Sequence, residues 1–472
     1  MIPTTLAAAA AATGGTLGGG ADPDALVTAP VVFDSRQVLP GGLFVAFDGE
    51  RTDGHLHVAG ALERGAVAAL VTRPVDAPHV LVADAATAMG DLAREVAARF
   101  GPDLTVVGIT GSSGKTSTKD LVAQLLAPLG PTVAPPGSFN NELGHPYTVL
   151  LTERDTRYLV LETSARGIGH IAYLTGIARP RIGVVLNVGT AHLGEFGSQA
   201  AIAVAKGELV EALPPATDGG VAVLNADDPL VRAMAARTSA RVVFTGESET
   251  ADVRAVDVDA DASGRARFTL RYAGESVPVA LHLVGGHHVA NALAAAAVAL
   301  ECGRSPADVA AGLAAARPVS RWRMEVTDRP DGVTVVNDAY NANPDSVRAA
   351  LKTLAGLRRG GPDRGGRRAW AVLGPMAELG PAARDEHDAV GRLVVRLSID
   401  KLVAVGDDAR PVFTGASLEG SWDGEAAWEP DVDAAVAHLR AELRPGDVVL
   451  VKASRSAGLE RVAAALLEGG DA

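Results

Sequence analysis

The segment from Gly108 to Asp120, GITGSSGKTSTKD, limits most strongly what this chain can fold into. An apolar run, TVVGIT, leads into it, and a helix-like run, KTSTKDLVAQLLA, leads out of it. The glycines and serines between the two runs permit a tight turn, and its backbone N–H groups, reinforced by the N-terminus of a helix, can bind an anion. The pattern therefore predicts a strand, a phosphate-binding loop and a helix within an α/β fold.

The loop differs from the strict Walker A pattern. A glycine would stand five residues before Gly114, and that position is Ile109. Gly108 and Gly111 supply the turns instead. By the chemistry of such loops, Lys115 would contact phosphate oxygens and the Thr116 hydroxyl would coordinate Mg²⁺. The phosphate could be transferred, hydrolysed or used to activate another group, and the loop alone does not choose among these.

Composition excludes several classes of protein. At 472 residues the chain is long enough for two to three domains. A formal net charge of -13 argues against broad nucleic-acid binding. The single cysteine, Cys302, permits neither an intrachain disulfide nor a cysteine-rich metal site. The N-terminus lacks the basic region of a signal peptide, and we find no run of about twenty strongly apolar residues, so we expect no membrane span and a cytoplasmic protein.

The pattern of apolar runs divides the chain into three units. Residues 1–82 contain short strand-like runs (VVFDSRQV, LFVAFDG, AALVTR) between glycine-rich turns. In residues 83–316, continuous apolar runs such as YLVLET and RIGVVLNV are typical of parallel strands buried on both faces. In residues 317–472, the runs VTVVND, AWAVLG, KLVAVG and DVVLVK alternate with helix-like segments. We therefore expect a small α/β unit, a central P-loop-type parallel sheet and a C-terminal Rossmann-like unit.

Polar residues recur where these strands end. The positions are Lys115 and Thr116, Glu162, Asn187 and His192, Asp338 and Asn341, and Lys452. Ligands bind at the carboxyl edge of open α/β sheets, so the coincidence predicts one cleft between two units. Glu162 could hold Mg²⁺ there, although a glutamate at a strand end is common. A lone histidine such as His192 is more often structural than a ligand.

Two further segments have an ordinary structural interpretation beside a functional one. Lys206, in AVAKGELV, could be an exposed helical lysine paired with Glu208 or Glu211. The run VNDAYNANPDS, residues 336–346, could be a helix N-cap rich in Asn and Asp, which explains Asn343 and Asp345 but not the whole run.

Taken together and in this order, the segments resemble the Mur ligase family, and within it the MurF type. DSRQVLPGGLFVAFDGERTDGHLHVAGALERGA resembles the uridine-nucleotide-binding first domain of that family. GITGSSGKTS, FNNELGHPYTVLL, NVGTAHLGEFGS, AKGEL and HHVANALAA resemble its ATPase domain. NDAYNANPDS, VLGPMAELG and VLVKASR resemble its third domain, and FNNELGHP, YNANPDS, MAELG and KASR are the most specific of these matches.

The resemblance implies an ADP-forming ligase of peptidoglycan precursor synthesis. ATP would phosphorylate the terminal carboxylate of UDP-MurNAc-tripeptide, and the amine of D-Ala-D-Ala would attack the acyl phosphate. The family uses two Mg²⁺ ions and is expected to act as a monomer. By resemblance, Thr116, Glu162 and His192 would hold metal, together with Lys206 as a carbamate, and Lys115, Glu162, His192 and Lys206 would be catalytic.

The remaining roles are carried over position by position. The ATP-binding residues implied by the resemblance are Gly111, Ser112, Ser113, Gly114, Lys115, Thr116, Ser117, Asn291, Arg323 and Asp338. Ser35 and Arg36 match the uridine side, and Asn141 matches a position near the phosphates. Tyr340, Asn341, Asn343, Lys452, Ser454 and Arg455 lie where the dipeptide is expected.

Six positions depart from the family pattern. His170 stands where Glu is common, His288 for Asn, Trp322 for Gly, Asn337 for Asp, Pro375 for Asp and Ala453 for Gly. None of them removes a phosphate or Mg²⁺ ligand, but Pro375 and Ala453 flank the expected dipeptide pocket.

Several other functions compete with this one. A MurE-type ligase would usually show a D-N-P-R-like motif, which we do not find, and a folylpolyglutamate synthetase would lack the first unit around DSRQV. A non-catalytic nucleotide-binding scaffold need not retain Lys115, Thr116, Glu162, His192 and Lys206 together. A simple P-loop hydrolase or GTPase would release phosphate without a peptide and an amine.

Overall fold

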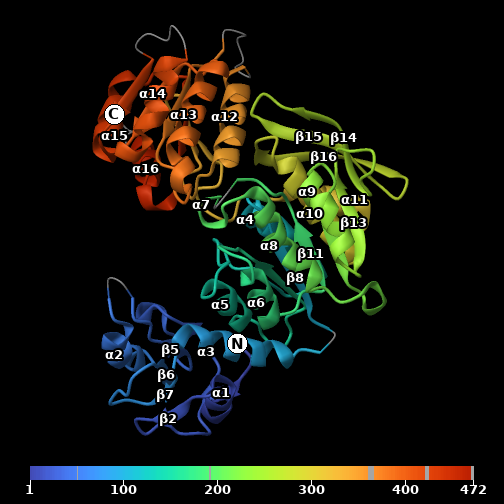
Figure 1. Ribbon diagram of the computed structural model, residues 1–472, viewed down its shortest axis with the longest axis vertical. Coiled ribbons are helices and arrows are strands. Elements are labelled where there is room, and N and C mark those ends of the chain that lie inside the picture. The colour runs from blue at the N-terminus through green and yellow to red at the C-terminus, as the bar shows by residue number, and fades with distance from the viewer. Residues whose placement is uncertain (50–51, 102, 191–192, 360–365, 420–424, 469–472) are drawn as a thin grey trace.

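The structure is a computed structural model, and it describes residues 1–49, 52–101, 103–190, 193–359, 366–419 and 425–468. Three α/β units follow one another along the long axis, with the N-terminal unit at one end and the C-terminal unit at the other (Figure 1). Each unit is organised around its own sheet. No helix in the described ranges is long and apolar enough to cross a membrane.

The N-terminal unit contains a five-stranded sheet in the order β2-β7-β6-β5-β4. Its strands are β2 (Thr16–Gly18), β4 (Val31–Val32), β5 (Leu43–Val45), β6 (Ala68–Val71) and β7 (His79–Leu81), and β1 (Thr4–Thr5) pairs with β3 (Leu26–Val27). The helices are α1 (Leu6–Thr13) and α2 (Val58–Glu63). The expected strand VVFDSRQV is wrong beyond β4, because Asp34 accepts a hydrogen bond from the Arg36 N–H and turns Ser35–Gln37 into a 3₁₀ helix.

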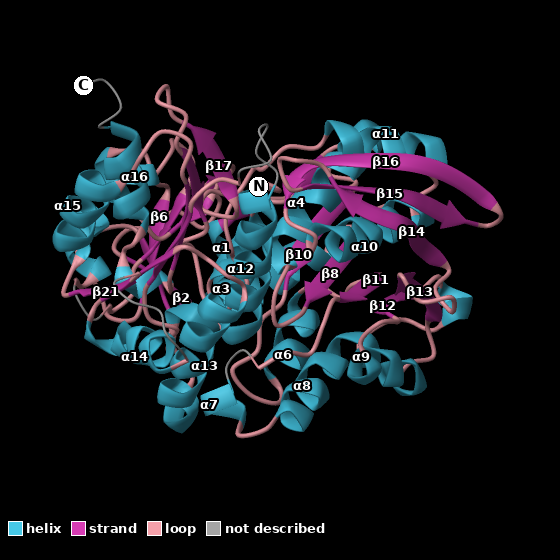
Figure 2. Ribbon diagram, turned by 90° about the horizontal axis from the view of Figure 1, so that it is seen from above, coloured by secondary structure: helices cyan, strands magenta, loops and turns pink. Residues whose placement is uncertain are grey.

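The central sheet has nine strands in the order β16-β15-β14-β13-β12-β11-β8-β10-β9. The parallel strands are β8 (Thr105–Thr110), β9 (Thr132–Val133), β10 (Tyr158–Glu162), β11 (Ile182–Val185), β12 (Val221–Asn225) and β13 (Arg241–Gly246), and β14 (Val253–Ala260) continues parallel to β13. β15 (Arg265–Tyr272) and β16 (Glu275–Val284) add antiparallel strands, which form a ribbon at one edge of the molecule (Figure 2).

Helices cover the central sheet. They are α4 (Lys115–Leu126), α5 (Gly144–Leu150), α6 (His170–Ile177), α7 (Leu193–Phe196), α8 (Gln199–Glu211), α9 (Pro229–Ala233), α10 (His288–Glu301) and α11 (Pro306–Ala315). The alanine-rich α10 packs closely on α4, because its small side chains let the helix approach the phosphate-loop helix and the sheet. The predicted strand, loop and helix around Gly108 are confirmed as β8 and α4.

The C-terminal sheet has the order β17-β18-β22-β19-β20-β21 and is parallel except for β17. Its strands are β17 (Glu325–Asp328), β18 (Thr334–Asn337), β19 (Ala369–Leu373), β20 (Lys401–Val405), β21 (Ala426–Glu429) and β22 (Val448–Lys452). Its helices are α12 (Pro344–Arg359), α13 (Ala383–Arg396), α14 (Arg410–Leu418), α15 (Val432–Glu442) and α16 (Glu460–Glu468). Apolar clusters lie on both faces of the sheet, as the continuous apolar runs predicted.

Helix α3 (Ala85–Ala98) joins the first two units into one core. Its buried residues Met89, Leu92 and Val96 belong to a cluster that includes Leu6 and Leu70 of the first unit and residues of α5 and β10 of the central unit. The first sheet is therefore fixed to the central unit through a shared apolar layer.

Candidate active site

A cavity of about 570 Å³ lies where the carboxyl ends of the central and C-terminal sheets meet. The central unit contributes the phosphate loop, and the C-terminal unit contributes the loops after β18, β19 and β22. The sequence-predicted residues that line it are Ser112, Ser113, Gly114, Lys115, Thr116, Ser117, Asn141, Asn187, Asn291, Arg323, Asp338, Tyr340, Asn341, Asn343, Lys452, Ser454 and Arg455. The structure thus brings together side chains that are separated by more than half of the sequence.

The phosphate loop turns at Gly114, which has φ +85° and caps the N-terminus of α4. A Cβ added to Gly114 would lie 2.4 Å from the Asn291 Oδ1 atom of α10, so the position needs glycine for space as well as for conformation. Asn291 is buried against the loop and lines the cavity. Residues 114–117, at the start of α4, line the cavity, and the N–H groups of a helix N-terminus favour an anion.

Lys115 is the first residue of α4, and its Nζ donates a hydrogen bond to the Gly111 carbonyl at 2.7 Å. Burial lowers the pKa of Lys115 to about 8, against a raising effect of Glu162 and a smaller lowering effect of Arg323. The attraction of Glu162 is therefore too small to offset the loss of water around the Lys115 ammonium. A bound phosphate would supply a further anion.

Glu162 ends β10, beside β8 in the sheet. Its Oε2 accepts hydrogen bonds from Thr116 Oγ1 at 3.3 Å and Ser138 Oγ at 3.0 Å. Its Oε1 is buried and has no hydrogen-bond partner among the described residues. A buried carboxylate oxygen without a donor is costly, and a cation would satisfy it.

Thr116 and Glu162 fit a magnesium site for this reason, with phosphate oxygens and water as further ligands. Within the described ranges no three His, Cys, Asp or Glu side chains cluster tightly enough to hold a metal by themselves. His192, a third predicted metal ligand beside Lys206, lies outside the described residues.

Lys206 is buried in the middle of α8, with an exposed fraction of 5%. The exposed, paired lysine considered from the sequence is therefore wrong. Glu208 accepts instead from the backbone N–H groups of Gly169 and Ala172, and Glu211 pairs with Arg237. Burial, with a smaller effect of Lys115, lowers the pKa of Lys206 well below its ordinary value, which favours the uncharged amine.

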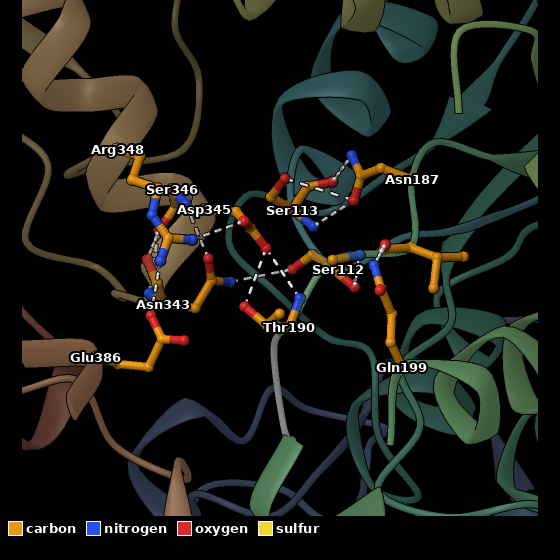
Figure 3. A network of polar contacts seen from close by, with 12 residues as sticks. Ser112, Ser113, Asn187, Thr190, Gln199, Asn343, Asp345, Ser346, Arg348 and Glu386 are labelled. Atoms are coloured by element: carbon orange, nitrogen blue, oxygen red, sulfur yellow. Dashed lines mark hydrogen bonds and ion pairs between the residues drawn. The ribbon is translucent and has the colours of Figure 1, made fainter. Parts of the chain in front are cut away.

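The segment after β11 packs against the phosphate loop. Asn187 Oδ1 accepts a hydrogen bond from the Ser113 N–H at 3.0 Å, and Asn187 Nδ2 donates to the Ser113 carbonyl at 3.2 Å. Figure 3 shows this pair of bonds beside Ser112. Asn187 therefore holds the predicted phosphate loop in place, which explains why a polar residue follows β11 at this position.

The opposite wall of the cavity comes from the C-terminal unit. Lys452, the last residue of β22, forms a buried ion pair with Asp338, with 2.6 Å between Nζ and Oδ2. Its Nζ also donates to the Asn341 carbonyl at 2.9 Å. The Lys452 ammonium therefore fixes the loop after β18, in addition to the contact with dipeptide implied by the resemblance.

Arg323 connects the two walls. Its NH2 group donates to Thr116 Oγ1 at 3.1 Å, and its guanidinium lies 4.1 Å from the centre of the Tyr340 ring. The cation is thus held flat on an aromatic face from the C-terminal unit while it reaches the phosphate loop. This geometry suits a group that neutralises phosphate.

Trp322 stands where the family pattern has glycine, and its φ is +59°. This left-handed conformation explains why glycine is usual there, since a bulky residue adopts it only under constraint. The constraint is visible: Arg455 stacks on the Trp322 ring at 4.2 Å, and the Tyr340 N–H donates to the Trp322 carbonyl. The Trp322 ring therefore stacks on Arg455, a residue that lines the cavity.

The other departures from the pattern are accommodated around the cavity. The Pro375 carbonyl accepts from the Ser454 N–H at 2.9 Å, and Ala453 is fully buried against Gly374. Asn337 Oδ1 accepts from the Ala339 N–H at 3.2 Å. His288 is buried against His287 with ring centres 4.2 Å apart, and His170 lies 3.3 Å from Glu142.

Three predicted substrate residues lie elsewhere or have structural duties. Ser35 and Arg36 belong to the N-terminal unit and do not line this cavity, and Arg36 forms an exposed pair with Asp34. Asn141 lines the cavity, but its Oδ1 accepts from the Leu143 and Gly144 N–H groups at the start of α5.

Sequence reasoning missed a buried pair behind the phosphate loop. Lys119 lies on α4, pairs with Asp120 at 3.0 Å, and donates to the carbonyls of Pro135 and Gly137. Asp120 Oδ2 accepts from the Ser320 N–H at 3.0 Å, so α4 holds the segment that leads to Arg323. The sequence offered one signal for this pair, namely two adjacent charged residues on a part of α4 that must be buried.

Comparison with known proteins places this architecture in a family. The Mur ligase middle domain matches residues 109–299, the Mur ligase glutamate ligase domain matches residues 322–455, and the catalytic domain of the Mur ligase family matches residues 30–99. The chain belongs to the Mur ligase family. The phosphate loop, Glu162 and Lys206 all lie within the middle-domain match of this Mur ligase.

Relatives and solved structures agree along the whole chain. A UDP-N-acetylmuramoyl-tripeptide–D-alanyl-D-alanine ligase of Mycobacterium tuberculosis is 53% identical, with 99% of this chain and 98% of the relative covered. A crystal structure of MurF from Acinetobacter baumannii superposes with a TM-score of 0.86 at 31% identity, over 99% of both chains. MurF of Thermotoga maritima in complex with ADP gives a TM-score of 0.79 at 30% identity, over 94% of this chain and 98% of that one. The predicted family, MurF type, α/β fold class and ligase class are confirmed.

Proposed function

We propose that this Mur ligase joins D-Ala-D-Ala to UDP-N-acetylmuramoyl-tripeptide with ATP as the source of energy. The observation that carries the proposal is the shared cavity, in which a phosphate loop with Lys115 faces Lys452 and Asp338 of a second sheet. A hydrolase needs only the first wall. A ligase needs both, because a phosphorylated acid and an amine must meet.

The energetic problem is that the γ-phosphate and the peptide carboxylate repel each other. Lys115 and Arg323 lie at the phosphate side, where their positive charge offsets this repulsion as the carboxylate oxygen attacks phosphorus and the bond to ADP breaks. Magnesium held at Thr116 and Glu162 would neutralise phosphate charge when bound. The product of this step is a mixed anhydride with a good leaving group.

The second step forms the amide. The dipeptide amine attacks the acyl carbon, the tetrahedral intermediate collapses, and inorganic phosphate leaves while the nitrogen loses a proton. Tyr340, Asn341, Asn343, Ser454 and Arg455 line the part of the cavity contributed by the C-terminal unit and would orient the dipeptide there. Water must be kept from the anhydride in the meantime.

Lys206 would become a metal ligand by reaction with CO₂. The uncharged form of a lysine amine is the nucleophilic one, burial favours that form, and its addition to CO₂ with loss of a proton yields a carbamate, an anion that a metal ion can bind. His192 would share a second Mg²⁺ with this carbamate.

The remaining roles complete the proposal. Residues 1–82 would bind the uridine nucleotide through Ser35 and Arg36, residues 83–316 would bind ATP, and residues 317–472 would bind the dipeptide. Asn291 and Asp338 would contact the nucleoside, with Asp338 at the ribose. The enzyme would act as a monomer in the cytoplasm, where ATP is available.

Phosphate release tests the proposal. The assay contains ATP, Mg²⁺ and a UDP-muramoyl-tripeptide, with D-Ala-D-Ala or single amino acids as acceptor, and mass spectrometry detects the extended peptide. We expect release that depends on both peptide and dipeptide. Release without the dipeptide would indicate a hydrolase, release with a single amino acid would indicate a MurE-like ligase, and no release would indicate a scaffold. Parallel assays with lysine and diaminopimelate tripeptides identify the third residue.

A further inference from the structure

The N-terminus of α12 contacts the segment that follows β11 across the cleft. Asp345 Oδ2 accepts hydrogen bonds from both the N–H group and the Oγ1 hydroxyl of Thr190, at 2.9 and 3.2 Å. Figure 3 shows the two bonds converging on one carboxylate oxygen. Thr190 belongs to the central unit and Asp345 to the C-terminal unit, so this contact joins two sheets.

Gly189 makes the contact sterically possible. A Cβ at this position would lie 2.2 Å from Asp345 Oδ2 and 3.4 Å from Ser112 Cβ. The φ of Gly189 is not in the left-handed region, so the backbone there does not require glycine. The reason for a glycine is therefore the close approach of the Asp345 carboxylate.

The segment 187–190 transmits this contact to the phosphate loop. The Gly189 N–H donates to Ser112 Oγ at 2.9 Å, and the Ser112 N–H donates to the Asn187 carbonyl at 3.2 Å. Asn187 holds Ser113 as described above. A shift of Thr190 would thus move the residues that hold Ser112 and Ser113.

A second bond crosses the cleft beside the first. Asn343 Nδ2 donates to the Ser112 carbonyl at 3.3 Å, while Asn343 Oδ1 accepts from the Ser346 N–H at 2.9 Å and caps α12. The helix cap expected from the sequence is therefore present, and the same side chain also reaches the phosphate loop. Ser112 is bonded from both walls of the cavity.

The far side of Asp345 is held as well. Arg348 donates to Asp345 Oδ1 at 3.2 Å and to Glu386 at 2.7 Å, so the carboxylate is oriented from α12 and α13 (Figure 3). These side chains remain partly exposed, with 38% for Asp345 and 37% for Arg348. Exposed pairs add little to stability, so the effect of this network lies in its geometry.

We propose that Asp345 is a positioning residue that aligns the phosphate loop when the C-terminal sheet docks on the central unit. The inference rests on the proposed function, because its consequence is the placement of the phosphate loop against the acceptor side of the cavity. Most residues proposed to bind ATP belong to the central unit, and the substitution leaves Arg323 and Asp338 in place, so the loss of Asp345 should impair the chemical step more than nucleotide binding.

The test compares D345A and D345N with D385A. Asp385 occupies the first turn of α13, as Asp345 does in α12, and is exposed, so D385A controls for the loss of a helix-dipole charge. We expect D345A to lower kcat by about 10- to 100-fold, because small misplacements of reacting groups have effects of this size. The Kd for ATP should change less than about threefold. D345N keeps an acceptor oxygen and should lose less activity, and D385A should match the parent enzyme.

Hydrogen exchange provides a readout that does not depend on the substrate. D345A should raise amide exchange in the peptide that contains Thr190, with no change in the melting temperature, and G189A should reproduce both the exchange and the kcat effects. Unchanged exchange in D345A would overturn the inference even if this variant has lost activity. If the parent protein lacks ligase activity but D345A shows the increased exchange, the proposed function is contradicted and the docking contact is still supported.

Discussion

Lys452 and Asp338 pair at 2.6 Å at the ends of two adjacent parallel strands, β22 and β18, and both side chains are buried. The resemblance assigned them to different ligands, Lys452 to the dipeptide and Asp338 to the nucleoside. Because the two charges are paired, a charged ligand that binds to one of these residues should alter the interaction of the other with its own ligand. Coupling between the two substrates is therefore expected at this pair.

The first prediction concerns this ion pair. K452M leaves the Asp338 carboxylate buried without its partner and should lower the free energy of unfolding of the C-terminal unit by about 3 kcal/mol. The double variant D338N/K452M should recover part of that loss while remaining inactive. Trp322, Trp370, Trp422 and Trp428 all belong to residues 317–472, so tryptophan fluorescence during urea unfolding reports on this unit. Equal stability of K452M and the parent protein would contradict the prediction.

The second prediction concerns proton uptake by Lys115. Its pKa of about 8 is below the ordinary value, and phosphate anions favour the charged form, so MgATP should raise the pKa. Between the free and the bound pKa, at about pH 8.5 to 9.5, binding should take up a proton. Calorimetry in buffers of different ionisation enthalpy measures this uptake. K115M should abolish it, and K352M, at an exposed lysine of α12, should not.

The third prediction concerns the carbamate. K206A should be folded and inactive, and ¹³C-bicarbonate should give a carbamate carbon signal in the parent protein that is missing from K206A. Depletion of CO₂ should lower activity reversibly, because the carbamate and the neutral amine are in equilibrium. Full activity of K206A, or no labelled signal in the active enzyme, would refute this role of Lys206.

The fourth prediction concerns His145, which is buried on α5 with Nδ1 3.2 Å from the Glu162 carbonyl. Burial lowers its pKa to about 4, so the unfolded chain binds more protons between the unfolded and the folded pKa. Stability should thus be complete above about pH 6.5 and fall as the pH approaches 4, with a contribution of about 3 kcal/mol from this histidine. H145Q should reduce the slope of stability against pH, measured by urea unfolding and circular dichroism. Part of the slope should persist, because burial also lowers the pKa of His287 and His288.

Local sequence patterns were sufficient to predict the strands and the residues at their ends. The β8 run and the glycines before Lys115 are contiguous, and Glu162 ends a run that is apolar throughout, so both could be placed at one sheet edge. The ribbon of β14, β15 and β16 was missed, although alternate residues of β15 are buried and its sequence alternates accordingly.

Contacts between distant segments could not be predicted in this way. Asp345 was expected only to cap or begin a helix, and its bond to Thr190 depends on how two sheets dock. Lys206 was compared with its helical neighbours, whereas its burial is decided by the elements packed against α8. In both cases the surroundings of the side chain are set by tertiary packing, which local spacing does not contain.

Helix α3 carries a consequence for recombination between relatives. Its residues Met89 and Leu92 belong to an apolar cluster with residues of both neighbouring units. A chimera with its junction just before this helix would therefore pack the native helix against a foreign N-terminal unit. A chimera that exchanges α3 together with the first unit would instead pack a foreign helix against the native central unit. Exchange of the N-terminal unit between relatives should therefore succeed only when the apolar surfaces on both sides of α3 come from the same parent.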